Sequence, residues 1–355
     1  MEMESKNAVR FFLGANTARG FYSLYDELAD PLSGDTVWYI KGGPGNGKST
    51  FMRRVADAAS AAGKTADRFP CSGDPDSLDA IFIREARTAY VDATSPHVRE
   101  PVLPGASGRY LDLSIFYKPG LEQKASGIHR LFSLYREQYA RCYELLRAAE
   151  LCAPEKTPGL LSNDVLRRVR DAADAAADRE LTAGPGFSLR RRFLSALTCQ
   201  GRVTFWESVG ESGQVVAAES EYGLAGVFLR RLLDRSRELG CPAVLCPDPL
   251  SPEEPEAVIL PASGISFVAS CRNRPIPVRV RHRIRLDARM DRQAIRSLAE
   301  PARACEELRS GLLREAEAAL KRAKGFHDEL EALYRPYVDF SGVDRLCEKH
   351  MDLYA

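Results

Sequence analysis

The chain has 355 residues, 45% of them hydrophobic, which is enough apolar material for about two domains of ordinary size. Its 50 basic and 49 acidic side chains nearly cancel, so neither nucleic acid nor a membrane surface is expected as a partner. No apolar run approaches the roughly 20 residues of a membrane span, and residues 1–10 carry no apolar signal core. We therefore expect a cytoplasmic globular protein.

The nine cysteines are scattered along the chain without any Cys-x-x-Cys pair. No histidine stands at zinc-finger spacing from them. This pattern favours buried thiols over a metal site.

The first third of the chain alternates strand-like and helix-like segments, as an α/β fold with a parallel sheet requires. Short apolar segments predict strands, and an amphipathic segment closed by a glycine predicts a helix. The predicted strands are 37–40, 65–71, 80–83 and 89–92, and the predicted helix is 49–62. A long amphipathic helix at 121–151 and a second helix at 162–180 then form an arm. The turn-rich stretch 182–187 is the best candidate for a domain boundary.

The sequence after this boundary repeats the sequence before it. Residues 12–20 read FLGANTARG and residues 193–201 read FLSALTCQG. The helix segment 51–57 reappears at 228–234, and both copies continue to a glycine, at Gly63 and Gly240. Each copy ends in helices, about 289–354 in the second. We infer two tandem α/β domains of common ancestry.

A glycine-rich loop follows the predicted strand 37–40 and fits the pattern G-x-x-x-x-G-K-[ST] of a phosphate-binding P-loop. Glycines with positive φ let backbone N–H groups point at phosphates, and the helix N-terminus adds partial positive charge. Lys48 is expected to reach the β- and γ-phosphates, and the Ser49 hydroxyl to bind Mg²⁺. The predicted nucleotide-binding residues are Gly42, Gly43, Pro44, Gly45, Asn46, Gly47, Lys48, Ser49 and Thr50.

Carboxylates near this loop are candidates for the rest of the site. Asp92 ends the predicted strand 89–92, where a second Mg²⁺ ligand is expected, although a turn cap would also explain it. Asp74 and Asp76 lie in an acidic loop after the strand 65–71, at the edge where open α/β sheets bind ligands. They could position water, act as a general base or cap a turn. No glutamate follows Asp92, and His97 could orient a water molecule or remain an ordinary loop histidine.

These segments together resemble a family of poorly characterised bacterial ATP-binding proteins built from two tandem P-loop halves. The likeness rests on residues 12–21, 42–50, 71–79 and 91–97 and spans nearly the whole chain. It implies ATP binding and a duplicated P-loop NTPase fold, with a P-loop domain at 1–186 whose helical arm spans about 121–180. The second domain, 187–355, would be a degenerate repeat with its own C-terminal helices. The resemblance brings no established reaction.

The second copy lacks the residues that Mg-ATP needs. Alignment on the repeated helix places Ala225 over Lys48 and Gly226 over Ser49, and Ala269 takes the place of Asp92. Glu219 and Glu221 would repel phosphates. We therefore predict one competent site, and a second half that is structural or regulatory.

Two basic segments of the second half have open roles. The cluster 190–192 could supply an arginine finger or form a solvated face. The segment 278–286 alternates apolar and basic residues, as a half-buried strand would. Its basic face could bind phosphate-rich ligands or nucleic acid, or it could simply protect an edge strand by charge.

Three functions fit these observations. The first is a slow ATPase or ATP-dependent switch that uses ATP and Mg²⁺. The second is a kinase for a nucleotide or other small-molecule acceptor, which a group of arginines could hold: Arg84, Arg87, Arg99 and Arg109. The third is a module in which ATP stabilises a form that binds a protein partner. ATP is the default nucleotide because no guanine-reading motif is present.

Overall fold

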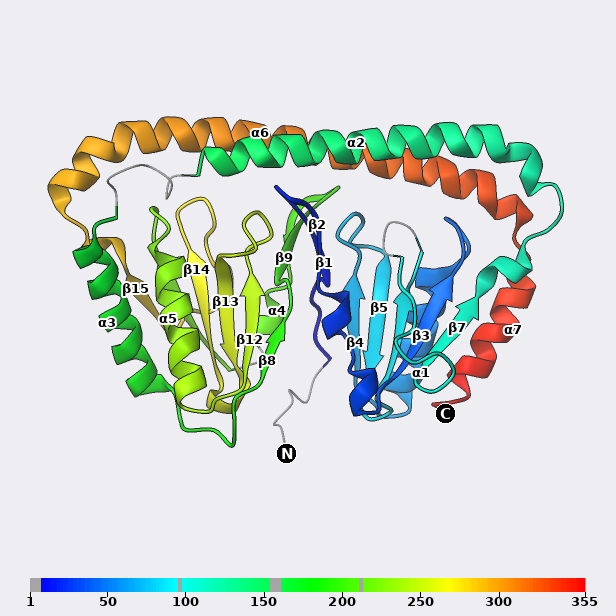
Figure 1. Ribbon diagram of the computed structural model, residues 1–355, viewed down its shortest axis with the longest axis horizontal. Helices are drawn as coiled ribbons and strands as arrows, with labels where there is room; N and C mark the ends of the chain where they lie inside the picture. Colours follow the sequence, from blue (N-terminus) through cyan, green and yellow to red (C-terminus); the bar gives the residue numbers. More distant parts are fainter. Residues whose placement is uncertain (1–7, 95–97, 154–160, 211–212, 355) are drawn as a thin grey trace.

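The computed structural model describes residues 8–94, 98–153, 161–210 and 213–354. It shows two mixed α/β halves side by side, with two long helices that cross both of them at one end (Figure 1). The first sheet has the order β4 (Ala66–Pro70), β5 (Leu78–Ile83), β6 (Thr88–Asp92), β3 (Thr36–Lys41) and β7 (Gly108–Asp112). The second has the order β8 (Leu189–Arg191), β12 (Ala243–Pro247), β13 (Pro255–Leu260), β14 (Ile265–Ser270), β11 (Gln214–Glu219) and β15 (His282–Arg285).

Both sheets are mixed, so the expectation of a parallel sheet is confirmed for only some of the strand pairs. Strand β3 is parallel to β6 and β7, but β5 is antiparallel to both β4 and β6. The loops 71–77 and 84–87 are too short for a crossover helix, so these strands follow one another as hairpins. The second sheet repeats the pattern: β11 is parallel to β14 and β15, and β13 is antiparallel to β12 and β14.

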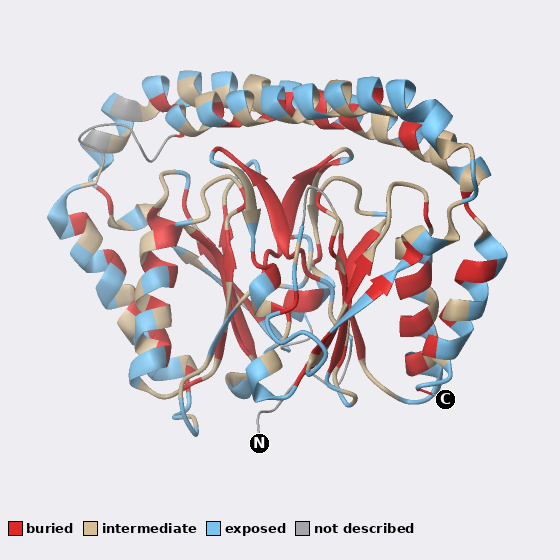
Figure 2. Ribbon diagram, turned by 45° about the vertical axis from the view of Figure 1, so that its right-hand side comes forward, coloured by how far each residue is buried: buried red, intermediate tan, exposed pale blue. Residues whose placement is uncertain are grey.

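The two sheets pack face to face across a shared core. Side chains alternate along a strand, so Val37 and Tyr39 of β3 point toward the second half, whereas Ile40 points toward the helices of the first half. Val215 and Ala217 of β11 belong to the same core cluster as Val37 and Tyr39. Figure 2 shows the buried residues concentrated in the strands of both sheets and in the hairpins between them.

Two hairpins lie between the sheets, where the repeated segments 12–20 and 193–201 meet. They are formed by β1 (Gly14–Thr17) with β2 (Gly20–Ser23) and by β9 (Ser195–Thr198) with β10 (Gly201–Thr204). Phe12 N–H donates to the Phe193 carbonyl over 2.9 Å, and Phe193 N–H donates to the Phe12 carbonyl over 3.0 Å. This reciprocal pairing relates the two hairpins by an approximate twofold axis.

The helices are exchanged between the halves. They are α1 (Lys48–Ala61), α2 (Ala125–Leu151), α3 (Asn163–Glu180), α4 (Glu207–Gly210), α5 (Leu224–Glu238), α6 (Arg292–Tyr334) and α7 (Phe340–Met351). Helix α3, which follows the first sheet in sequence, packs against α5 on the second sheet. Helix α7, which follows the second sheet, packs against α1 on the first through Val343 and Cys347.

The long helices α2 and α6 make this exchange possible because they carry the chain across and back (Figure 1). They lie antiparallel along each other, and Ala316 and Ala319 of α6 are small enough to let Leu146 of α2 approach closely. Short 3-10 helices connect the main elements: η1 (Tyr25–Glu27), η2 (Pro31–Ser33), η3 (Leu113–Phe116), η4 (Leu121–Lys124), η6 (Pro261–Ser263), η7 (Asp287–Arg289) and η8 (Arg335–Tyr337).

Within the part of the chain that the structure describes, no helix combines the length and apolar character needed to cross a membrane. The nine cysteines are free thiols, and four of them are buried: Cys142, Cys241, Cys246 and Cys347.

Helix α7 places a histidine in the core of the first half. His350 lies against Trp38 and Phe51, and its Nδ1 is 3.0 Å from the Tyr90 hydroxyl. Burial lowers the pKa of His350 below its ordinary value of 6.5. The neutral imidazole can accept a hydrogen bond from the Tyr90 hydroxyl, whereas the imidazolium cannot.

This buried histidine predicts that the protein is less stable in acid. Because the pKa of His350 is lower in the folded chain than in the unfolded chain, the free energy of unfolding should fall as the pH drops below about 6.5. We expect His350→Gln to weaken this pH dependence, measured by urea unfolding at a series of pH values. Burial also lowers the pKa of His282 and His327, so part of the dependence should remain.

His129→Gln is the matched control, since His129 is exposed on α2. It should keep the wild-type pH dependence. If the free energy of unfolding of His350→Gln depended on pH as that of the wild type does, His350 would not be a source of the acid sensitivity.

Candidate nucleotide site

The predicted P-loop connects the carboxyl end of β3 to the first turn of α1. Its glycines occur where the backbone requires them: Gly42, Gly45 and Gly47 have φ angles of 143°, 71° and 86°. Side chains other than glycine rarely adopt these angles. The spacing of glycines therefore has a conformational cause, and the loop curls over the N-terminus of α1.

The structure brings Lys48, Asp92 and Ser49 together at this loop. Lys48 Nζ donates to the Gly42 and Gly43 carbonyls over 2.7 and 2.9 Å and lies 3.6 Å from Asp92 Oδ2. Asp92 reaches this position because it stands opposite Ile40 in the β3–β6 register, beside the start of the loop. The Ser49 hydroxyl accepts from the Leu78 N–H over 2.9 Å.

Ser49 and Asp92 fit the needs of Mg²⁺ next to a polyphosphate. Hydroxyl and carboxylate oxygens are the ligands that Mg²⁺ takes at such sites, with phosphate and water oxygens completing its shell. Among the described residues no group of three or more His, Cys, Asp or Glu side chains could hold a metal by itself. A metal at this position would therefore depend on the nucleotide.

The acidic loop after β4 is held by contacts to other parts of the chain. The Asp76 carboxylate accepts from Gln200 Nε2, at the tip of the second hairpin, over 2.8 Å. Asp74 lies 3.4 Å from Lys324 Nζ of α6 and also accepts from the Asp76 N–H. These carboxylates thus join the two halves, a role that the sequence did not suggest. His97 lies outside the described residues.

The P-loop is covered by residues that sequence analysis did not connect with it. Gly43 N–H donates to the Tyr117 hydroxyl over 2.7 Å. A β-carbon at Gly43 would lie 2.9 Å from Tyr334 Cε1, and one at Gly45 would lie 3.0 Å from the Glu331 carbonyl oxygen. Positions 43 and 45 thus need glycine also because the last turn of α6 packs on them. A glycine can mark a place where another backbone approaches closely. This was the signal in the sequence that could have indicated the contact with α6.

The charges at this end of α6 face Lys48. His327 lies 3.7 Å from Glu331, and its pKa is lowered by burial and, to a smaller extent, by the charges of Lys324 and Lys48. The carboxyl-terminal third of α6 therefore forms one wall of the candidate site.

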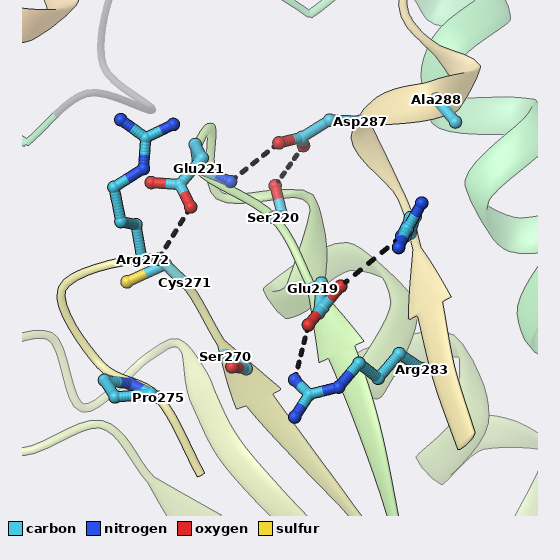
Figure 3. Close-up of a pocket in the computed structure, with 11 residues that line it drawn as sticks. Glu219, Ser220, Glu221, Ser270, Cys271, Arg272, Pro275, Arg283, Asp287 and Ala288 are labelled. Carbon is cyan, nitrogen blue, oxygen red and sulfur yellow. Dashed lines mark hydrogen bonds and ion pairs between the residues drawn. The ribbon is translucent and has the colours of Figure 1, made fainter.

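The corresponding edge of the second sheet has a different structure (Figure 3). Residues 220–223 link β11 to α5 and form a shorter loop than 42–47. The Asp287 carboxylate accepts from the Ser220 hydroxyl over 2.6 Å and from the Glu221 N–H over 2.8 Å. A carboxylate of the chain thus occupies the loop donors that a phosphate would need.

A pocket of about 420 Å³ lies beside this loop. Its arginines and carboxylates partly neutralise one another: Glu219 accepts from Arg283 over 2.6 Å and lies 3.9 Å from Arg285. In the sheet register Ala269 stands opposite Ala218, as Asp92 stands opposite Ile40 in the first sheet. The second half has no lysine or carboxylate at the positions of Lys48 and Asp92.

The arginine cluster 190–192 does not act as the sequence suggested. Arg191 pairs with Glu27, and the buried Arg192 donates to the Glu27 carbonyl over 2.7 Å. Both side chains are thereby tied to η1 of the first half. These two arginines contact η1 instead of the P-loop.

Comparison of the chain with models of known protein families, with curated proteins and with solved structures finds no match.

The contact between α6 and the P-loop makes a prediction about stability. Gly45→Ala should strain a positive φ and also push against Glu331, whereas Gly63→Ala strains a φ of 77° with no atom within 4 Å of the new methyl. We expect both variants to lose about 1–2 kcal/mol from the φ strain, and Gly45→Ala about 1–3 kcal/mol more from the overlap. Urea unfolding measures both values. Equal losses in the two variants would mean that α6 does not press on the loop.

Proposed function

We propose that the first half binds Mg-ATP through the loop 42–50 and that the protein is an ATP-dependent switch with slow hydrolysis. The observation that carries this proposal is the convergence of Lys48, Asp92 and Ser49 on a glycine loop at the carboxyl edge of a sheet. Open α/β sheets bind ligands at this edge. The loop N–H groups and the α1 N-terminus would hold the phosphates.

Each residue then has a stated task. Lys48 would contact the β- and γ-phosphates, and Ser49 and Asp92 would hold Mg²⁺, directly or through water. The ion supplies positive charge against the phosphates and orients them. Ala93 follows Asp92, so the position next to it holds no side chain that could activate water. Hydrolysis should therefore be slow.

The hydrogen bond between the loop and Tyr117 supports a switch. Phosphate oxygens would compete with the Tyr117 hydroxyl for the Gly43 N–H. Displacing Tyr117 disturbs Tyr334, whose ring centroid lies 5.8 Å from that of Tyr117. Because Tyr334 ends α6, nucleotide binding would reach the second half through this helix.

The two halves also support the proposal of a tandem duplication. They share the strand order, the parallel and antiparallel pairings, and the hairpin in which Thr17 or Thr198 donates to the carbonyl of a following glycine over 2.8 Å. We propose that one P-loop unit was duplicated and that the second copy lost its lysine, hydroxyl and carboxylate. This agrees with the family resemblance of the sequence.

The kinase alternative draws less support. Arg84 pairs with Asp67, and Arg87 with Asp35, at the opposite end of the first sheet from the P-loop. Arg99 pairs with Asp26. The arginines that might have held an acceptor thus make contacts within the chain.

Removal of the lysine tests nucleotide binding directly. Lys48→Ala should weaken Mg-ATP binding by about a hundredfold or more, because it removes a charged contact to two phosphates. Isothermal titration calorimetry with ATP and Mg²⁺ measures this, and phosphate release follows turnover. Lys41→Ala is the control. Lys41 belongs to the same strand-and-loop segment, but its side chain binds the Ala93 carbonyl and Glu100. This variant should keep the wild-type affinity for Mg-ATP. Unchanged binding in Lys48→Ala would remove the basis of the proposal.

The switch makes a separate prediction about Tyr117. Tyr117→Phe should tighten nucleotide binding by roughly threefold to tenfold, because the Gly43 N–H then has no resident acceptor to exchange. Tyr334→Phe is the matched control, since the Tyr334 ring touches the loop but its hydroxyl makes no hydrogen bond to any residue that the structure describes. Weaker binding in Tyr117→Phe would indicate that the hydroxyl helps to hold the nucleotide instead of competing with it.

A further inference from the structure

The end of α6 brings several side chains with nitrogen donors to the first half from the second. Lys324 lies near Asp74 and Asp328, and His327 near Glu331, so carboxylates accompany both. Arg335 differs. Among the described residues its guanidinium forms no recorded hydrogen bond or ion pair, and the residue is exposed.

Arg335 is fixed next to the P-loop by its stem. A β-carbon at Gly45 would lie 3.2 Å from Arg335 Cγ, which places the aliphatic part of the side chain against the middle of the loop. The backbone there is the start of η8, and its Arg335 carbonyl accepts from the Val338 N–H over 3.2 Å. Val338 is buried in the core of the first half. The base of Arg335 is therefore anchored, while its guanidinium is free to turn toward a ligand.

We propose that Arg335 contacts the terminal phosphate of the nucleotide held by the loop 42–50. This inference rests on the proposed ATP binding and adds a residue that the second half delivers to that site. A guanidinium carries a permanent charge and a planar set of donors that matches phosphate oxygens. An arginine finger, one of the two roles considered for the cluster 190–192, is thus assigned to the opposite end of the second half.

The role of Arg335 in hydrolysis follows from the charge that the reaction moves. A water oxygen bonds to the γ-phosphorus while the bond from that phosphorus to the β–γ bridging oxygen breaks. ADP leaves with the bridging oxygen and its electron pair, and the proton of water passes to phosphate or solvent. Arg335 stabilises the negative charge on the γ-oxygens and the bridging oxygen during this step.

The experiment compares triphosphate with diphosphate. We measure dissociation constants of a β,γ-imido ATP analogue and of ADP, both with Mg²⁺, for the full-length wild type and for Arg335→Ala, Arg335→Lys and Arg292→Ala. Arg335→Ala should weaken binding of the ATP analogue roughly tenfold or more and leave ADP binding within about twofold. Arg335→Lys should restore part of the difference, since the charge returns without the planar donors. Arg292 is exposed at the opposite end of α6, and its variant should match the wild type.

Each other outcome decides the question. If Arg335→Ala binds both nucleotides as the wild type does, or loses both equally, Arg335 does not contact the terminal phosphate. Thermal unfolding of each variant shows whether an equal loss of affinity for both nucleotides comes from misfolding. If Arg335→Ala is misfolded, Arg335→Lys decides the question. That variant should bind the ATP analogue less well than the wild type does and should bind ADP equally well. If the wild type binds neither nucleotide, the proposed function itself fails and this inference falls with it.

Discussion

The apolar inner faces of the two sheets are buried in one shared core, and the rest of the molecule is arranged around this constraint. Val37 and Tyr39 of the first sheet and Val215 and Ala217 of the second belong to this core, together with residues from the segments between the sheets, such as Leu13. Burial of such faces is the main favourable term in folding. At the centre, the reciprocal backbone bonds of the two hairpins keep the buried polar groups satisfied. Neither half would be complete without the other.

Exchange of helices adds a second dependence between the halves. Helix α3 covers the second sheet and α7 covers the first, so each outer layer contains a helix that comes from across the molecule. The crossing helices α2 and α6 are what this exchange requires (Figure 1). As a result, the end of α6 lies on the glycine loop 42–47, and the second half contributes to the candidate site of the first.

The loops after β3 and β11 satisfy the same backbone N–H group in two different ways. The N–H of the second residue after the central strand needs an acceptor in both halves. Tyr117 supplies a neutral hydroxyl to Gly43, whereas Asp287 supplies a carboxylate to Glu221. A phosphate can replace a neutral hydroxyl at small electrostatic cost, but it is repelled by a resident carboxylate with Glu219 and Glu221 beside it. This difference is the physical reason why our proposal places the nucleotide at the first loop and not at the second.

Local patterns in the sequence were enough to place the strands around β3, β5 and β6, helices α1, α2, α3 and α6, and the glycine loop. Alternation of apolar residues fixes a strand, a spacing of three and four fixes a helix, and glycines mark positive φ. The position of Asp92 at the end of a strand also predicted that it would lie beside Lys48, because neighbouring parallel strands end at the same edge. The repeat predicted that two similar sheets would form, and their strand orders agree.

Only the tertiary structure decided which surfaces these elements cover. The apolar stripe of α3 or α7 would fit either sheet, and nothing within the stripe specifies a partner far away in sequence. Such long-range contacts decide that Arg191 and Arg192 bind Glu27. They also decide that Glu331, Tyr334 and Arg335 pack on the loop 42–47. By itself the sequence placed the glycine loop 42–47 and Lys48 between a strand and a helix, and from these we predicted a single phosphate-binding loop. The fold decided what covers that loop, because the cover comes from a helix that begins in the other half.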